Sequence, residues 1–525
     1  MTEQTTNHKP QTTNYRIIVI LFFAVFLCVG LFIYRDYGIS WDELVSRNNG
    51  LLTYKYVFQG DQELLTYRDR YYGTAFEVFL ILVEKLIGFD DPRGIFLMRH
   101  LTTFLLFYLS TIVFYLLCRD RFRSRGAGMV GVLFLVLSPR IFAHSFYNSK
   151  DLAFLSLFII SMFSLVKYLE RKTLLRAFLH ALASALLVST RILGIIVPVI
   201  TFLFVAADIF LDKERRRKEV IISFLAYLAL AAFFTVMFWP ILWMDPVGQF
   251  LTAFRQMSRF HFWSTVLYLG EYVKAESLPW HYIPVWILVT TPVIYIVFFA
   301  AGLAVSVKNF FTGPADFYRA KKVDIISVLW FFIPLASVIA LRSVLYDGWR
   351  HVFFIYPAFV LISLSGVTAL FDFLKVRSRG RARTIACAVC AGVAAACLIN
   401  TAWLMVKWHP YQNVYFNVLT GNMENAKDKF DLDYWGLSYR QALEYIAQND
   451  KEEIIKISAA NPPARVNLLM LELADRARFV FVEDSKDAKY FMSNYRWHKE
   501  EYPYKDEFFS IKVGGAKIMV VYKLR

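Results

Sequence analysis

Long apolar runs recur along most of the chain, and they limit what it can fold into. Runs of about 17–24 residues are long enough to cross a hydrocarbon core ~30 Å thick as helices. A helix satisfies its own backbone hydrogen bonds inside lipid, so we expect each run to be helical. With 57% hydrophobic residues and 50 phenylalanines, the composition is also typical of a polytopic membrane protein. We expect eleven spanning helices, at residues 17–34, 95–117, 127–142, 151–167, 174–190, 192–210, 220–240, 283–306, 325–341, 351–371 and 384–406.

The net charge of +16 is unevenly distributed. Residues 407–525 carry 18 Lys and Arg against 17 Asp and Glu, so the excess lies in the apolar part of the chain. There it falls mostly in short connections between helices. Basic short connections are typical of the cytoplasmic side of a membrane protein rather than of a nucleic-acid groove. We therefore expect no nucleic-acid partner.

These connections also predict the orientation of the chain. If the N-terminus is cytoplasmic, the five inner connections between 119 and 383 hold 22 Lys and Arg, and four outer connections hold 8. The asymmetry favours a cytoplasmic N-terminus and an extracytoplasmic C-terminus. The polar residues 1–14 would form a disordered cytoplasmic tail, and 15–406 the transmembrane domain. We interpret 17–34 as a retained first helix, because no small-residue cleavage site follows it.

Two segments then lie on the outer side. The first outer loop, at 35–94, contains the run TAFEVFLILVEKLIGF (74–89), which predicts an amphipathic helix in the membrane interface. Residues 407–525 predict a small extracytoplasmic α/β domain. Its expected helices are 438–449 and 464–477, and its expected strands are EEIIKISAA, ARFVFVE and AKIMVVYKL.

An acidic pair follows the first helix in the string DYGISWDE. A carboxylate held at the membrane face can take a proton from a hydroxyl group, which makes Asp42 and Glu43 candidates for a general base. Two adjacent acids in a loop are also common solvated charges, and the pair alone does not decide between these readings.

A polar break interrupts the hydrophobic pattern at SPRIFAHSFYNSKDLAF (138–154), on the outer side. Ionisable residues at membrane depth are costly and are therefore candidates for function. A polar outer turn that reaches water is the alternative. The candidates in this break are Arg140, His144, Lys150 and Asp151.

Two arginines lie at predicted outer helix ends, Arg191 in STRILG and Arg350 in YDGWRHVFFIYP, where His351 follows. Arginine binds phosphate through a planar fork of donors. Interfacial anchoring beside Trp349 is the competing interpretation. The acids, the polar break and both arginines nevertheless share one predicted face, and such convergence is a stronger signal than any one of them.

Four strings resemble a known family: DYGISWDE, SPRIFAHSFYNSKD, GWRHVFFIYPA and HPYQNVYFN with LDYWGLSYRQAL. They are similar to the bacterial branch of the protein O-mannosyltransferases, which are GT-C glycosyltransferases of glycosyltransferase family 39. The aminoarabinose lipid A transferases are relatives of similar architecture. The resemblance covers roughly 36–151 and 340–443. The chain lacks the β-trefoil insertion of the eukaryotic members, which puts a protein acceptor in doubt.

The resemblance implies a function and a site. The function is inverting transfer of a monosaccharide from a polyprenyl-phosphate donor to a hydroxyl of a lipid, glycan or protein, at the outer face of the bacterial inner membrane. Asp42 would be the catalytic carboxylate with Glu43 beside it. Asp151 would be a second acidic position, and Arg350 would bind the donor phosphate. Arg191 and Lys150 would assist, with Arg140, His144 and His351 as further substrate-binding candidates.

The resemblance requires no cofactor, although Asp42, Glu43 and Asp151 could converge on a divalent metal ion. A transporter or flippase of a lipid-linked envelope precursor is the alternative class. Such proteins often show inverted repeats and broken helices near the bilayer midplane. A structural factor that recruits partners is a third class, and it would leave Asp42 dispensable.

Overall fold

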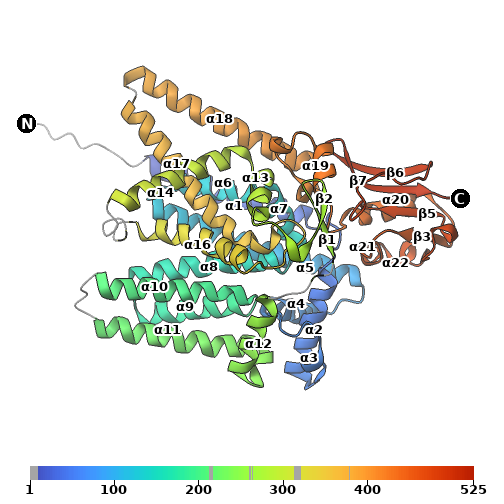
Figure 1. Ribbon diagram of the computed structural model, residues 1–525, viewed down its shortest axis with the longest axis horizontal. Coiled ribbons are helices and arrows are strands. Elements are labelled where there is room, and N and C mark those ends of the chain that lie inside the picture. The colour runs from blue at the N-terminus through green and yellow to red at the C-terminus, as the bar shows by residue number, and fades with distance from the viewer. Residues whose placement is uncertain are drawn as a thin grey trace, which may run out of the picture.

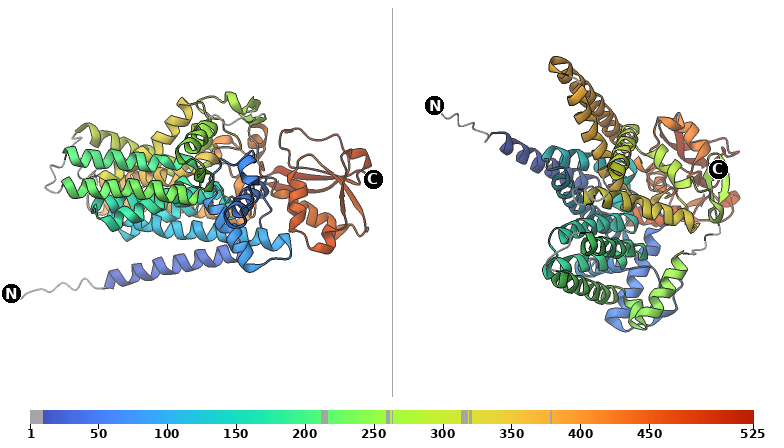
Figure 2. Two further views of the ribbon diagram at one scale, coloured as in Figure 1. Left: turned by 90° about the horizontal axis from the view of Figure 1, so that it is seen from below. Right: turned by 60° about the vertical axis from the view of Figure 1, so that its left-hand side comes forward.

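A bundle of long helices makes up most of the molecule, with a small sheet domain at one end (Figure 1). The structure is a computed structural model that describes residues 10–211, 217–258, 262, 264–312, 318, 321–377 and 379–525. The first helix starts at the end opposite the sheet domain (Figure 2). The expected tail at 1–14 lies mostly outside the described residues, and α1 already begins at Pro10. The chain is thus a polytopic α-helical membrane protein with a small C-terminal sheet domain.

Nine helical segments in the described part of the chain are long and apolar enough to cross a membrane. A tenth is counted if one bent pair of helices forms a single span. The nine lie in α1 (Pro10–Ile33), α5 (Pro92–Phe122), α8 (Asp151–Glu170), η1 with α10 (Ile192–Ile195, Ile196–Leu211), α11 (Arg217–Phe238), α14 (Val293–Thr312), α16 (Lys322–Ala340), η4 with α17 (Arg350–Ile355, Tyr356–Arg377) and α18 (Gly380–Lys407).

Two of the eleven expected spans therefore have no counterpart among these nine segments. The run at 127–142 is divided into α6 (Arg125–Val136) and α7 (Pro139–Tyr147), which meet at an angle of 69°. Proline lacks the backbone donor of a helix interior and disfavours a helical residue before it, so the helix breaks before Pro139. The run at 174–190 is helix α9 (Leu174–Val188), whose 15 residues are short for a span.

Helices α14 and α17 approach each other closely because each has a glycine at the contact. A Cβ atom on Gly302 would collide with the carbonyl oxygen of Ile362, and one on Gly366 with that of Phe298. The expected span at 283–306 begins before this contact, at α13 (Tyr282–Thr290). Thr291 then adopts an extended conformation before Pro292, which separates α13 from α14.

The first outer loop is folded as three helices, α2 (Glu43–Gln59), α3 (Glu63–Thr66) and α4 (Ala75–Ile87). Helix α4 matches the amphipathic helix expected at 74–89, whereas α2 was not expected. Arg47 of α2 pairs with Glu84 of α4 at 2.5 Å. Gly73 lies against the backbone of Ser189, so the loop is held against the end of α9.

A second long connection, between spans, joins α11 to α13. It comprises η2 (Pro240–Trp243), α12 (Pro246–Ser258), the antiparallel hairpin β1 (Thr265–Tyr268) with β2 (Glu271–Lys274), and η3 (Ala275–Ser277).

The C-terminal domain has a mixed five-stranded sheet in the order β4-β3-β5-β7-β6. Strand β3 runs parallel to β4 and β5, while β7 runs antiparallel to β5 and β6. Its elements are η5 (Gln412–Val414), η6 (Val418–Thr420), α19 (Met423–Lys429), α20 (Ser438–Asn449), β3 (Ile455–Ala459), α21 (Pro463–Asn467), η7 (Leu468–Met470), α22 (Leu473–Arg476), β4 (Phe479–Phe481), η8 (Ser485–Asp487), β5 (Tyr490–Ser493), β6 (Glu507–Val513) and β7 (Ala516–Lys523).

The expected helix at 438–449 is α20, and the three expected strands are β3, β4 and β7. The expected helix at 464–477 is instead three short turns, α21, η7 and α22. The helical path is interrupted at Leu471 and Glu472, whose ψ values are 155° and 149°. Asn467, at the end of α21, accepts from Ile39 N–H at 2.9 Å and donates to Ile39 C=O at 3.0 Å through its side chain. That side chain ties the domain to the segment between α1 and α2.

Candidate active site

Three carboxylates surround the guanidinium group of Arg350, at the start of η4. Its Nη2 lies 3.1 Å from Asp42 Oδ2, and its Nη1 lies 3.1 Å from Asp151 Oδ2. Asp347 Oδ2 lies 3.3 Å from Nη2. The Arg350 side chain is 1% exposed, so these acids compensate a cation that has lost its water. Residues from three distant segments, predicted to share one face, thus meet in space.

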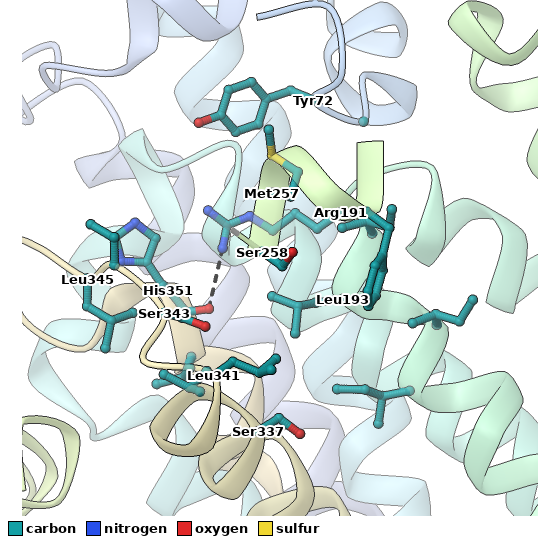
Figure 3. Close-up of a pocket in the computed structure, with 18 of the residues that line it drawn as sticks. Tyr72, Arg191, Leu193, Met257, Ser258, Ser337, Leu341, Ser343, Leu345 and His351 are labelled. Atoms are coloured by element: carbon teal, nitrogen blue, oxygen red, sulfur yellow. Dashed lines mark hydrogen bonds between the residues drawn. The ribbon is translucent and has the colours of Figure 1, made fainter. Parts of the chain in front are cut away.

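Arg191 adds a second cation on the other side of Asp151. Its Nη2 pairs with Asp151 Oδ1, and its Nη1 donates to the carbonyl oxygen of His351 at 3.4 Å (Figure 3). Asn148 also binds Asp151, donating from its side-chain amide at 2.9 Å and accepting from the Asp151 N–H at 2.9 Å. The break after α7 therefore forms a turn that fixes Asp151 at the start of α8.

The two acids of the first outer loop point in different directions. Asp42 directly precedes α2 without capping it through its side chain, and it faces Arg350 with 32% of its side chain exposed. Glu43 is buried, accepts from Ser40 N–H at 3.2 Å and lies 3.2 Å from His100 Nε2. Glu43 thus braces the loop that presents Asp42. Asp36 stays peripheral, paired with His409 at 2.7 Å.

Lys150 precedes Asp151 and lies near both arginines. Its ammonium group lies 3.4 Å from the centre of the Tyr72 ring. Burial, with a further contribution from the charge of Arg191, lowers the pKa of Lys150 to about 8. Lys150 is therefore a cation near neutral pH that can lose its proton in mildly alkaline solution.

A cavity of about 390 Å³ adjoins these cations. Lys150, Arg191, Arg350 and His351 belong to its lining, and Figure 3 shows Arg191 on the side facing Tyr72. Ser337 and Leu341 of the α16 region lie across the cavity from Tyr72. Its other walls are largely apolar and include Ile196, Val199 and Ile200 of α10 and Ile333 and Val338 of α16.

The charged cluster lies at one end of the spans. Three of the candidate membrane-crossing segments begin at Asp151, Ile192 and Arg350, which are cluster residues or the neighbour of Arg191. The polar groups are therefore gathered at one membrane face, and the apolar wall of the cavity is formed by the beginning of α10 and the end of α16.

Arg140 and His144 lie apart from the cavity lining. Arg140 is buried, donates to the carbonyl oxygen of Tyr415 at 3.0 Å and lies 4.6 Å from the Phe416 ring centre. His144 contacts Asn148 at 3.0 Å and Trp435 Nε1 at 3.3 Å. Both side chains support the segments around the site rather than face the cavity.

His351 does line the cavity, beside Arg350. Its ring packs edge-on against Tyr346, with 4.7 Å between the ring centres. Within the part of the chain that the structure describes, its Nδ1 has no hydrogen-bond partner.

The residues do not form the metal site that the acids could have made. No group of three metal-ligating side chains occurs among the described residues. Asp42 and Asp151 are both engaged by Arg350, and Glu43 is turned toward His100. The three carboxylates proposed as ligands therefore do not converge.

Asp347 is a contact of Arg350 that the sequence reading did not single out, although it lies within the quoted string YDGWRH. The DG dipeptide is a turn signal, and Asp347 and Gly348 have positive φ of 59° and 73°. Trp435 is a second omission. The centre of its ring lies 4.5 Å from Arg350 Cζ. The sequence indicated Trp435 only through its place in the string LDYWGLSYRQAL.

No protein-family model and no curated protein matches the chain. Among solved structures, the apo oligosaccharyltransferase of Archaeoglobus fulgidus matches with a TM-score of 0.51 and 11% identity, over 89% of this chain and 65% of that one. The fold is GT-C-like. The chain thus spans about two thirds of the length of that archaeal protein, and the identity level makes this a likeness of fold.

Two further structures have lower scores. ArnT from Cupriavidus metallidurans, bound to undecaprenyl phosphate, matches with a TM-score of 0.46 and 12% identity, over 96% of this chain and 97% of that one. The archaeal oligosaccharyltransferase AglB with an inhibitory peptide and a dolichol-phosphate also has a TM-score of 0.46, with 11% identity, over 90% and 69% of the two chains.

Proposed function

We propose that this GT-C-like protein is an inverting membrane glycosyltransferase. It moves a monosaccharide from a polyprenyl-phosphate donor to an acceptor hydroxyl at the outer face of the bacterial inner membrane. The observation that carries the proposal is a cavity with apolar walls that is lined by Lys150, Arg191 and Arg350, beside the partly exposed Asp42. An amphiphile with an anionic head and an apolar tail fits these two surfaces.

The cations bind the donor phosphate. Arg191 and Arg350 present planar donor forks, and Lys150 adds a compact charge. Asp151 holds both arginines and stays buried, whereas Asp42 shares Arg350 from a more exposed position. The phosphate competes with Asp42 for Arg350, and its binding frees the Asp42 carboxylate for the acceptor.

The reaction then needs few groups. The acceptor oxygen attacks the anomeric carbon opposite the phosphate, so the configuration inverts. The bond between that carbon and the phosphate oxygen breaks, and its electron pair leaves with the polyprenyl phosphate, whose charge the arginines stabilise. The acceptor proton passes to Asp42. Glu43 and His100 hold the loop that carries Asp42 in place.

A transporter or flippase is the alternative. The cluster at one end of the spans favours the enzyme, because a carrier would be expected to place its charged groups near the midplane.

The test is a transfer assay with full-length protein in lipid vesicles. It uses a panel of labelled polyprenyl-phosphate monosaccharides, with isolated cell-envelope lipids and glycans as acceptors. Wild-type protein should transfer one of these sugars, and Asp42→Asn should reduce the rate by at least about 100-fold, because loss of a base commonly costs 10²–10⁴. Asp36→Asn is the matched control, since Asp36 pairs with His409 away from Arg350.

Asp36→Asn should retain the wild-type rate, and both variants should retain the wild-type melting temperature. Full transfer by Asp42→Asn would remove the proposed base. Movement of the donor from one leaflet of the vesicle membrane to the other, without transfer to any acceptor, would support the carrier instead.

A further inference from the structure

Arg496 is a buried arginine that the C-terminal domain contributes to the charged cluster. Its Nη2 lies 2.7 Å from Asp347 Oδ1, and its Nη1 donates to the carbonyl oxygen of Tyr434. We propose that Arg496 is a positioning residue for the transfer reaction, which fixes Asp347 and Trp41 and thereby sets the geometry of Arg350 and Asp42. This inference rests on the proposed function. It makes the C-terminal domain part of the active site.

The first route runs through Asp347. One carboxylate oxygen of Asp347 receives Arg496, and the other lies 3.3 Å from Arg350 Nη2, which also contacts Asp42. Asp347 is 6% exposed, so it has little water with which to replace a lost partner. Burial raises the pKa of Asp347, while the charges of Arg496 and Arg350 oppose this effect. Without Arg496, Asp347 would be free to turn fully toward Arg350 or to take up a proton.

The second route runs through Trp41, the residue directly before Asp42. The Cζ of Arg496 lies 4.7 Å from the centre of the Trp41 ring, over its face. Trp41 N–H donates to the carbonyl oxygen of Trp435 at 3.2 Å, and the Trp435 ring lies 4.5 Å from Arg350 Cζ. The same guanidinium group therefore acts on both members of the Asp42–Arg350 pair.

The turn that presents Arg496 is built to hold it. It follows β5, and the residues on either side of Arg496, Tyr495 and Trp497, have positive φ of 59° and 62°. Bulky residues rarely adopt this conformation, and they keep it where the surrounding structure holds them. Asn494 donates to the carbonyl oxygen of Asp433 at 2.8 Å, and Trp497 Nε1 donates to that of Thr265 at 2.9 Å. The strained turn is thus held on both sides.

The geometry predicts that a change at Arg496 affects the transfer rate much more than the binding of the donor. Arg496 does not line the cavity, so the phosphate keeps Arg191, Arg350 and Lys150 when Arg496 is shortened. The rate should fall, because a reacting group displaced by ~1 Å can cost about 100-fold. A residue needed only for folding would change the melting temperature instead.

The experiment uses full-length protein in lipid vesicles and two substitutions that preserve size, Arg496→Lys and Asp347→Asn. Lysine keeps the charge but has no planar fork, and asparagine keeps the shape of Asp347 without its charge. Arg465→Ala is the control, because this arginine of the same domain is exposed and lies over the Phe481 ring, at 4.8 Å, away from the charged cluster. The measurements are the transfer rate at saturating donor, the dissociation constant of undecaprenyl phosphate and the melting temperature.

We expect both substitutions to lower the rate by at least about tenfold while the dissociation constant changes less than about threefold. The double variant should lose less activity than the product of the two single losses, because both substitutions remove the contact between Arg496 and Asp347. Wild-type transfer rates in Arg496→Lys and Asp347→Asn would overturn the positioning role and leave the proposed function intact. A lower transfer rate accompanied by weaker binding of undecaprenyl phosphate and a lower melting temperature would show that Arg496 has a structural role only. Absence of transfer by wild-type protein with every donor would overturn both proposals.

Discussion

At the scale of single residues, Lys150 differs from the two arginines in being able to lose its charge near physiological pH. Its pKa is lowered to about 8 by burial and by the charge of Arg191. An arginine stays protonated throughout this range. The charge of the cations that line the cavity therefore depends on pH at one position.

We predict that affinity for undecaprenyl phosphate falls as pH rises from about 7 to about 9.5. The second ionisation of a phosphate monoester lies near pH 6, so the ligand's charge is nearly constant there. Lys150 is charged below its pKa of about 8 and neutral above it. Bound phosphate stabilises the ammonium form and moves the midpoint upward. Titration of the dissociation constant against pH measures the effect.

Lys150→Arg is the matched variant for this titration. It keeps its charge over the whole range, so its affinity should stay nearly constant up to pH 9.5. Identical curves for wild type and Lys150→Arg would show that Lys150 does not meet the phosphate.

Sequence reasoning could identify the acidic pair at 42–43 but could not separate its members. Their roles depend on the rotation of α2 and on its partners, His100 for Glu43 and Arg350 for Asp42. Asp347 and Arg496 were missed for a related reason. The contact between them joins positions 149 residues apart in the chain, and no local pattern indicates it.

At the scale of elements, the contact between α14 and α17 depends on two glycines. Small residues let membrane helices approach closely and pack through their backbones. A methyl group at Gly302 or Gly366 would meet a backbone carbonyl of the other helix, which cannot rotate away as a side chain can.

We predict that Gly302→Ala and Gly366→Ala each lower the melting temperature of the purified protein, with a destabilisation of about 1–3 kcal/mol, typical of overpacking. Gly392→Ala in α18 is the control, because a Cβ there meets nothing within 4 Å. It should leave the melting temperature unchanged or raise it slightly, since alanine favours helices. A similar melting temperature for all three variants would contradict the close packing.

The positions of helices and strands were predictable where the hydropathy pattern was strong. They were less predictable where tertiary contacts determine where an element begins or ends. The long apolar runs located the spans, and the helical periodicity located α20. Pro139 indicates the bend between α6 and α7, but the expected span at 127–142 did not include a bend. Strands β5 and β6 were not predicted, and the run at 464–477 leaves the helical conformation at Leu471 and Glu472.

At the scale of the whole molecule, the sheet domain and the start of α1 lie at opposite ends (Figure 1). The charge asymmetry of the connections predicts that the end with the sheet domain is extracytoplasmic. This orientation decides on which side of the membrane each connection lies. It also decides on which side the candidate active site lies.

We predict that a cysteine at Leu473 reacts with a membrane-impermeant maleimide in intact cells. A cysteine at Val376 should react only after lysis. The side chains are 71% and 84% exposed, so accessibility is not limited by the protein itself. The five native cysteines are first replaced so that labelling reports the new position. The reverse pattern would place the site on the cytoplasmic face.

The size of the cavity limits how much of the proposed lipid donor the protein can contact. A volume of about 390 Å³ is that of a site for a drug-sized molecule, far too small for a polyprenyl chain of many isoprene units. If the donor binds as proposed, only the isoprene units next to the phosphate can lie against α10 and α16, and the remainder of the chain stays among the acyl chains of the bilayer. In that case the protein distinguishes donors by the head group and by the first isoprene units. The length of the remaining tail is then determined by the lipids of the membrane and not by the protein.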